Sequence, residues 1–80
     1  MEMHTVEPLE LDVRADLARG EEPFDRIMQA VASLEPGQSL RLTAPFEPVP
    51  LYGVLGRSGF THQTQQVAND EWVVIFTPQA

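Results

Sequence analysis

Residues 20–44 constrain the fold most, because both ends of a helix and the strand that follows it are readable there. Pro23 suits the first helical position, where the N–H that proline lacks is not needed. Apolar side chains then recur at the spacing of one helical face: Phe24, Ile27, Met28, Val31 and Leu34. Pro36-Gly37 ends the helix, and residues 39–44 alternate between polar and apolar types. The segment therefore predicts an amphipathic helix followed by a half-buried strand.

A first strand precedes this helix, because apolar and charged residues alternate from Leu9 to Arg14. Residues 15–22 are expected to form the loop between that strand and the helix. A strand, a helix and a second strand of these lengths predict a βαβ unit with parallel strands and a right-handed crossover.

A second, shorter helix is predicted after the proline-rich residues 44–50. The prolines exclude a strand there, but Pro50 can open a helix. Its apolar face would consist of Leu51, Val54 and Leu55. Gly59 is expected to end it.

The last part of the chain predicts a β-hairpin around the turn residues Asn69 and Asp70. Residues 60–67 are mostly polar, whereas residues 71–77 contain an unbroken apolar run, so the first strand belongs at the sheet edge and the second inside the sheet. Phe60 should face the core together with Trp72, Val74 and Phe76. This common orientation requires an odd-length loop or a β-bulge.

These elements predict an α+β fold, a two-layer α/β sandwich in the order β-α-β-α-β-β. Both helices should cover one face of a mixed four-stranded sheet. Residues 1–80 are expected to form a single domain, of which residues 1–6 are a loose N-terminal lead-in.

The composition excludes several classes of function. The chain has 80 residues, of which 12 are acidic and 5 basic, and its formal net charge is -7. The basic residues are all scattered arginines, so neither a nucleic-acid surface nor lysine chemistry is expected. The absence of cysteine excludes disulfides, thiolate catalysis and thiolate metal sites. Since no stretch looks like a signal peptide or a membrane span, we expect an acidic cytoplasmic protein that uses no cofactor and contacts no membrane.

Several segments of the chain resemble a known family. They are LDVR at residues 11–14, EPF at 22–24, LEPGQSL at 34–40 and EPVPLY at 47–52. Over residues 9–77 the chain resembles the TusA/SirA-like superfamily of small sulfur carriers, and it looks closest to the bacterial domain of unknown function 2249 family. This resemblance implies a TusA-like domain with strand order 1-2-4-3, in which strand four is antiparallel to the others. Members of the closest group occur alone or beside hemerythrin-like domains.

The resemblance does not extend to sulfur transfer. The sulfur carriers have a Cys-Pro-x-Pro motif at the start of the first helix, and Gly20 stands where that cysteine belongs when Pro23 is aligned with the second proline. Persulfide transfer needs a thiolate, which glycine cannot supply. A cysteine-dependent sulfurtransferase is therefore not expected.

Four residues are candidates for a binding site at the edge where both helices begin. Arg14, Arg19, Glu47 and Tyr52 lie in or beside the two loops that precede the helices, and open α/β folds bind ligands at that edge. The arginines and the positive helix ends suit a small anion, or the four residues together suit a protein partner. The alternative is that acidic residues of the same loops satisfy both arginines internally.

Other candidate residues carry weaker functional expectations. Val73 and Ile75 should face away from the helices and offer an exposed surface for a weak homodimer or another protein. His4 and His62 are too far apart in sequence to predict a metal site, so both are expected to be surface residues. No catalytic residue is predicted.

These observations favour a non-catalytic protein-interaction or regulatory module. The alternative is a small-ligand or a redox- or metal-accessory binding domain that works beside hemerythrin-like or respiratory proteins. An enzyme is the third and weakest hypothesis, because the chain is small and lacks the common nucleophiles.

Overall fold

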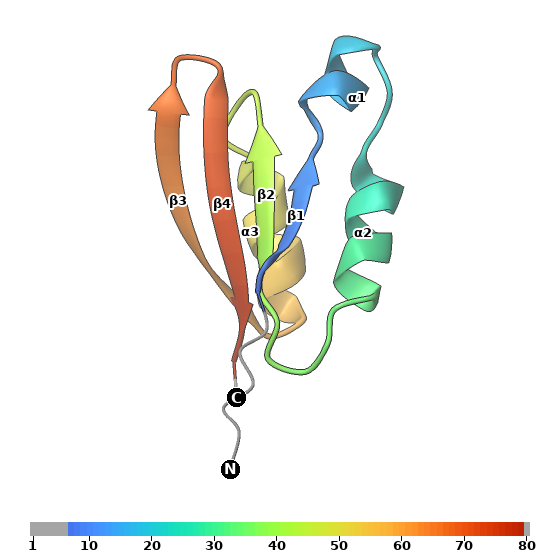
Figure 1. The fold of residues 1–80 in the computed structure, drawn as a ribbon, viewed down its shortest axis with the longest axis vertical. Helices are drawn as coiled ribbons and strands as arrows, with labels where there is room; N and C mark the ends of the chain where they lie inside the picture. Colours follow the sequence, from blue (N-terminus) through green and yellow to red (C-terminus); the bar gives the residue numbers. More distant parts are fainter. Residues whose placement is uncertain (1–6, 80) are drawn as a thin grey trace.

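Four strands form one mixed sheet in the order β1-β2-β4-β3 (Figure 1). The computed structural model describes residues 7–79. Within them, β1 (Leu9–Asp12) pairs in parallel with β2 (Leu40–Ala44), and β4 (Glu71–Pro78) is antiparallel to both β2 and β3 (Phe60–Ala68). The predicted strand order, the parallel first pair and the internal position of β4 are confirmed.

Within residues 7–79, three helices connect the strands instead of the predicted two. The additional helix is α1 (Arg14–Ala18), a single turn in the stretch that the sequence assigned to a loop. It follows Val13 directly and ends before Gly20, whose φ of 75° lies in the left-handed region that favours glycine. Five residues are too few to show a helical repeat of apolar side chains, so the sequence pattern could not reveal α1.

The two longer helices lie on the same side of the sheet, as predicted (Figure 1). α2 (Phe24–Ala32) packs beside β1, and α3 (Val49–Arg57) packs against β3. Pro23 is the residue before α2 and not its first helical residue, a shift of one position. No helix within residues 7–79 is long and apolar enough to cross a membrane.

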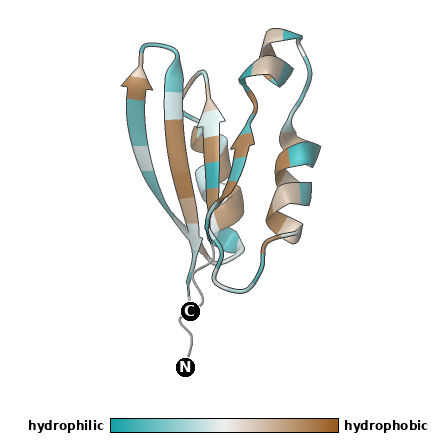
Figure 2. Cartoon of the chain, viewed as in Figure 1, coloured by the Kyte–Doolittle hydropathy of each residue, from teal (hydrophilic) through white to brown (hydrophobic). Residues whose placement is uncertain are grey.

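The core lies between the sheet and these helices. Leu40 and Leu42 in β2 are paired with Phe76 and Val74 in β4, and all four side chains are buried. Ile27 from α2 belongs to the same core. Figure 2 shows the resulting contrast between the hydrophobic middle of β4 and the mostly hydrophilic edge strand β3. Burial of one face of each element therefore stabilises a two-layer fold.

A β-bulge interrupts the hairpin near its turn, as the sequence predicted. Gln66 pairs with Trp72 and Ala68 with Glu71, which leaves Val67 without a partner in the ladder. The bulge permits Phe60, at the other end of β3, to pack against the core.

The opposite face of the sheet corrects one prediction. Val73 and Ile75 point away from the core cluster as expected, but only 8% of Val73 is exposed. Both residues line a shallow depression together with the long side chains of Arg41, Gln63 and Gln65. These long side chains cover apolar surface that the sequence pattern had left bare. The prediction of an exposed Val73 is wrong, and association through this face stays a prediction.

Candidate functional site

An open apolar groove lies where β1 and β2 end, between the start of α2 and the loop before α3. The volume of the groove is about 350 Å³. The lining residues are Val13, Leu17, Glu22, Pro23, Phe24, Ile27, Leu42, Ala44, Phe46, Pro48, Pro50 and Leu51. The two loops predicted to converge at this edge of the sheet therefore do meet, across the groove.

One wall of the groove is the start of α2. The carboxylate of Glu22 accepts a hydrogen bond of 3.0 Å from the backbone N–H of Phe24, which satisfies one free donor of the first helical turn. Pro23 is buried, but 40% of Phe24 is exposed. The sequence pattern placed Phe24 on the buried stripe of the helix. It lies instead at the groove, in the first turn of the helix.

The opposite wall is the proline-rich segment between β2 and α3. Pro48 in this segment and Pro50 in the first turn of α3 have restricted backbone torsion angles, and the N–H of Val49 donates to the carbonyl oxygen of Glu47 at 2.9 Å. Phe46 stands on this stiff segment with 52% of its surface exposed. A large aromatic side chain is thus held at the groove by backbone constraint.

The groove is suited to an apolar group. Glu22 is the one residue of its lining with a polar side chain, and that side chain already bonds to the backbone N–H of Phe24. Specific small-molecule pockets usually present several polar groups that fix the orientation of the ligand. The exposure of two phenylalanines beside an apolar cavity is the usual property of an interaction surface.

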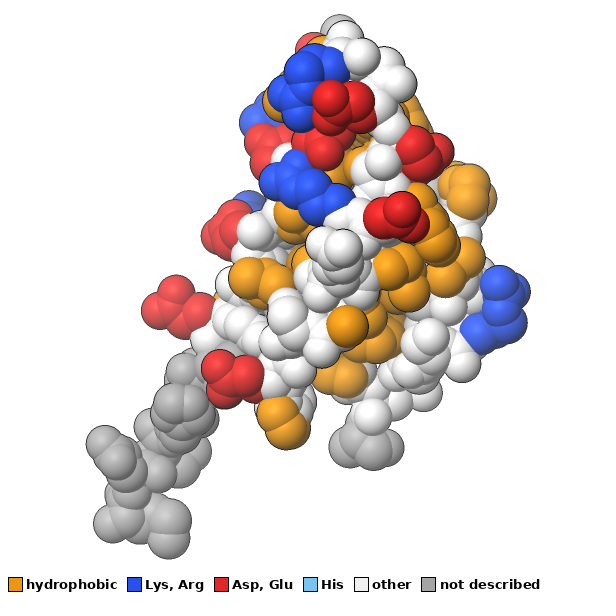
Figure 3. All heavy atoms as spheres, turned by 90° about the vertical axis from the view of Figure 1, so that its right-hand side faces the viewer, with side chains coloured by type: hydrophobic (Ala, Val, Ile, Leu, Met, Phe, Trp, Pro, Cys, Tyr) orange, Lys and Arg blue, Asp and Glu red, His pale blue; other side chains and the backbone are white. Residues whose placement is uncertain are grey.

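The face drawn in Figure 3 shows how this surface is bordered. Hydrophobic side chains form a continuous patch, and acidic side chains lie along its upper border. Arginines gather at the upper end, next to other acidic side chains.

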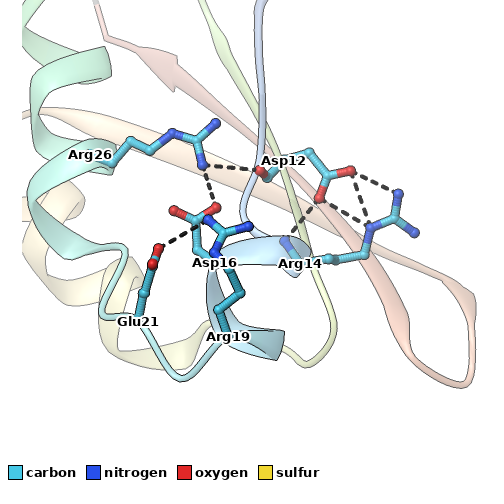
Figure 4. Close-up of polar contacts among 6 residues, drawn as sticks. All are labelled: Asp12, Arg14, Asp16, Arg19, Glu21 and Arg26. Carbon is cyan, nitrogen blue, oxygen red and sulfur yellow. Dashed lines mark hydrogen bonds and ion pairs between the residues drawn. The ribbon is translucent and has the colours of Figure 1, made fainter.

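A network of ion pairs surrounds α1 (Figure 4). Arg14 binds Asp12 through two guanidinium nitrogens, at 2.8 Å from Nη2 and 3.1 Å from Nε, and its Nη1 lies 3.5 Å from Glu71. The hydrogen bonds from Arg14 hold the pKa of the Asp12 carboxyl below its ordinary value. The guanidinium of Arg14 is therefore engaged on both sides.

Two further ion pairs complete this network. Arg26 of α2 binds Asp16 of α1, and Arg19 binds Glu21 at 3.0 Å. The hydrogen bond from Arg26 lowers the pKa of Asp16, and the one from Arg19 lowers the pKa of Glu21. Asp16 is buried, and its pair with Arg26 joins α1 to α2. The network stabilises the loop that forms one side of the groove.

A separate polar cluster surrounds Tyr52 on α3. Its hydroxyl donates to Glu47 at 3.0 Å and also contacts the hydroxyl of Thr64 in β3. Its ring stacks on His62, with centroids 3.8 Å apart and an angle of 3° between the rings. Burial raises the pKa of the Tyr52 phenol. These contacts attach α3 to the edge strand.

The four predicted site residues therefore fall into two groups. Arg14 and Arg19 lie in the ion-pair network, and Glu47 and Tyr52 bond to each other. No hydrogen bond or ion pair within residues 7–79 joins one group to the other, and none of the four lines the groove. Both arginines have intramolecular carboxylate partners, but only Arg19 pairs with a loop carboxylate, Glu21. The partners of Arg14 are Asp12 at the end of β1 and Glu71 in β4, which the sequence alternative did not name.

Sequence reasoning missed the residues that form the groove. Phe46 carried a usable signal, because a large apolar side chain between closely spaced prolines has no helical or strand partner. His62 is exposed and stacked on Tyr52, and His4 lies outside the described residues. No group of three or more His, Cys, Asp or Glu side chains within the described part of the chain could hold a metal ion.

This fold and groove define a small two-layer α+β domain with an apolar surface at one edge of its sheet. A family model for an uncharacterized conserved protein, DUF2249, matches residues 10–78. The chain therefore belongs to the DUF2249 family. No curated protein and no solved structure matches it. The strand order is compatible with the wider resemblance to the TusA/SirA-like superfamily.

Proposed function

We propose that the chain is a non-catalytic protein-interaction or regulatory module and that the groove is its docking site. The observation that carries this proposal is the pair of exposed phenylalanines, Phe24 and Phe46, beside an open apolar cavity. Aromatic side chains concentrate the binding energy of protein interfaces, and their exposure without a partner has a cost in water.

The chemistry of the neighbouring residues supports the non-catalytic part of the proposal. The sequence contains no cysteine, and Glu22 in the groove is bonded to a backbone N–H. The arginines beside the groove are held by carboxylates. A catalytic group needs freedom to reach the reacting atoms of a substrate, and these groups have intramolecular partners.

The cavity itself favours a second candidate, a domain that binds a small apolar ligand. Its volume of about 350 Å³ is within the range of small-molecule pockets, roughly 300–1,000 Å³. The scarcity of polar groups in the lining argues for the protein partner instead. A redox- or metal-accessory role beside hemerythrin-like or respiratory proteins stays a prediction from the family resemblance.

The test compares three immobilised proteins, the wild type, Phe46→Ser and Val67→Ser, in extracts of cells that naturally produce the chain. Val67 is the matched control, because 54% of it is exposed and it does not line the groove. We expect the wild type and Val67→Ser to retain the same proteins and Phe46→Ser to lose them at unchanged melting temperature. Equal retention by all three proteins would refute the groove as the docking site.

Native mass spectrometry of the same samples distinguishes a bound small ligand, the second candidate, from a protein partner. A small molecule bound to the wild type and to Val67→Ser but lost from Phe46→Ser would replace the proposed protein partner by a ligand.

A further inference from the structure

We infer that the groove receives a large apolar side chain from a positively charged segment of a partner protein. This inference rests on the proposed function and adds the chemistry of the partner. The observations behind it are the apolar lining of the groove and the unequal pairing of charges around it.

The lining determines the central part of the partner segment. The floor consists of buried aliphatic residues, among them Val13 and Leu42, and the rim carries Phe24 and Phe46. One large apolar side chain that enters such a cavity removes its own surface and that of both phenylalanines from water. Aromatic and long aliphatic side chains give the largest gain.

The charges at the border determine what flanks that side chain. Glu22 lines the groove, Asp25 follows Phe24 in sequence, and Glu47 follows Phe46. All three are exposed, and none makes an ion pair with another residue between positions 7 and 79. Glu47 accepts a hydrogen bond from a neutral phenol, which leaves its charge in place.

The nearby arginines do not neutralise these carboxylates. Arg19 is paired with Glu21, and Arg26 with Asp16. The border of the groove is therefore locally negative, in a chain whose formal net charge is -7. Lysine or arginine on both sides of the apolar side chain would complement this border, and interfaces use such complementarity for specificity and rate of association.

The same charges disfavour other occupants of the groove. A second copy of the chain would place its own three carboxylates against those of the first, and two molecules of charge -7 repel each other. A neutral apolar small molecule would make no use of the carboxylates. A basic amphipathic segment uses both the cavity and its border.

The test is an NMR titration of the full chain with a matched set of synthetic peptides. Each peptide has one variable position, occupied by Phe, Leu or Ser, and its flanking positions are occupied by either Lys or Glu. We expect shifts at Phe24, Ala44 and Phe46 with the lysine-flanked Phe and Leu peptides only. Their affinity should fall about tenfold when ionic strength rises from about 0.01 M to about 1 M, because salt screens the exposed carboxylates.

Substitutions in the chain test the assigned carboxylates. Glu22→Gln keeps an acceptor for the N–H of Phe24 but removes the charge, and it should weaken binding of the lysine-flanked Phe peptide about threefold, as should Asp25→Asn. Glu35→Gln is the matched control, because Glu35 is exposed, has no ion pair within the described residues and lies beyond the other end of α2. It should leave the affinity unchanged.

Each contrary outcome identifies which statement fails. Equal binding of the lysine- and glutamate-flanked peptides at the groove would overturn the basic partner but retain the docking site. Concentration-dependent shifts of the groove in the free chain would replace the partner by a second copy. Shifts with a neutral apolar compound but with no peptide would favour the small ligand. The proposed function itself fails if Phe46→Ser retains all partners in the extract experiment, or if native mass spectrometry finds a small ligand in place of a protein partner.

Discussion

The ion-pair network around α1 and the groove beside it differ in whether their side chains have partners within the chain. Around α1, Arg14, Arg19 and Arg26 each have a carboxylate partner. In the groove, Phe24 and Phe46 face solvent beside a cavity that no other part of the described chain fills. The charged region therefore satisfies its arginines internally, whereas the apolar region leaves two phenylalanines exposed to solvent.

The comparison teaches where to search for a binding surface in a small domain. Two of the ion pairs around α1 join residues two positions apart in sequence, Asp12 with Arg14 and Arg19 with Glu21. Charged loop residues at such short range find partners locally, and exposed pairs of this kind contribute little to stability. The groove requires residues from both halves of the chain, so its shape is a property of the fold. Substitutions that affect the two regions differently can test this distinction.

The largest effect is expected from Leu42→Ala, which removes the floor of the groove. Leu42 is fully buried and belongs to the core as well as to the cavity lining. Truncation of a buried leucine leaves a void, and the free energy of unfolding should fall by about 3 kcal/mol. Chemical denaturation measures this change. A decrease in the free energy of unfolding of less than about 1 kcal/mol would mean that Leu42 contributes little to the stability of the core.

A smaller effect is expected from Asp16→Asn, which breaks the one ion pair of the network that has a buried partner, Asp16. The melting temperature at neutral pH should fall by about 5 °C, because α1 loses its charged contact with α2. Arg26→Gln, which removes the other partner, should give a similar fall.

The pH dependence of the same variant gives an independent check. The hydrogen bond from Arg26 lowers the pKa of Asp16 in the folded chain below the ordinary value of an aspartate, so the stabilisation is complete above that ordinary value. It is lost as the pH falls through the lower pKa of the folded state. The difference in melting temperature between wild type and Asp16→Asn should therefore shrink below about pH 4. A constant difference down to pH 2 would contradict this assignment.

A still smaller effect is expected from Tyr52→Phe. The substitution removes the hydroxyl that bonds to Glu47 and Thr64 but keeps the ring stacked on His62. The free energy of unfolding should fall by about 1 kcal/mol, the usual net value of such hydrogen bonds. Binding of the lysine-flanked Phe peptide should not weaken, since Tyr52 does not line the groove. A loss of peptide binding would extend the docking site to α3.

The smallest effect on stability is expected from Arg19→Gln, which breaks a pair with both side chains exposed. The melting temperature should not change measurably, because solvent screens such pairs. The affinity for the lysine-flanked Phe peptide should rise about twofold, since Glu21 then adds a free carboxylate next to Glu22. A decrease in affinity would show that Arg19 itself contacts the peptide.

The sequence predicted most of the fold because regular patterns of apolar residues determine it. The two layers followed from three patterns: the apolar stripe on α2, the apolar run in β4 and the polar composition of β3. The bulge followed from the requirement that Phe60 face the core. The strand order came from the family resemblance. α1 was missed because it forms a single turn, which has no repeat to detect.

The site was less predictable because it depends on what remains uncovered after packing. Arg14 and Arg19 looked available in the sequence and are paired in the structure. Phe24 fitted the buried face of a helix and lies partly exposed at the helix start. Val73 looked exposed and is covered by long side chains of neighbouring strands. Exposure in each case is set by contacts between elements, which residue spacing alone does not encode.

The internal position of β4 has a consequence for synthesis of the chain on the ribosome. β2 receives its second neighbour from Glu71–Pro78, and the hairpin strand β3 pairs with β4 alone. At ordinary rates of translation, roughly 1–5 s pass between the synthesis of β2 and that of β4. A chain in which β4 has not yet joined the sheet leaves the free edge of β2 and the apolar faces of α2 and α3 open to chaperones and to neighbouring chains. A chain that ends before Glu71 would therefore aggregate, because its β2 never receives the second neighbour that β4 provides.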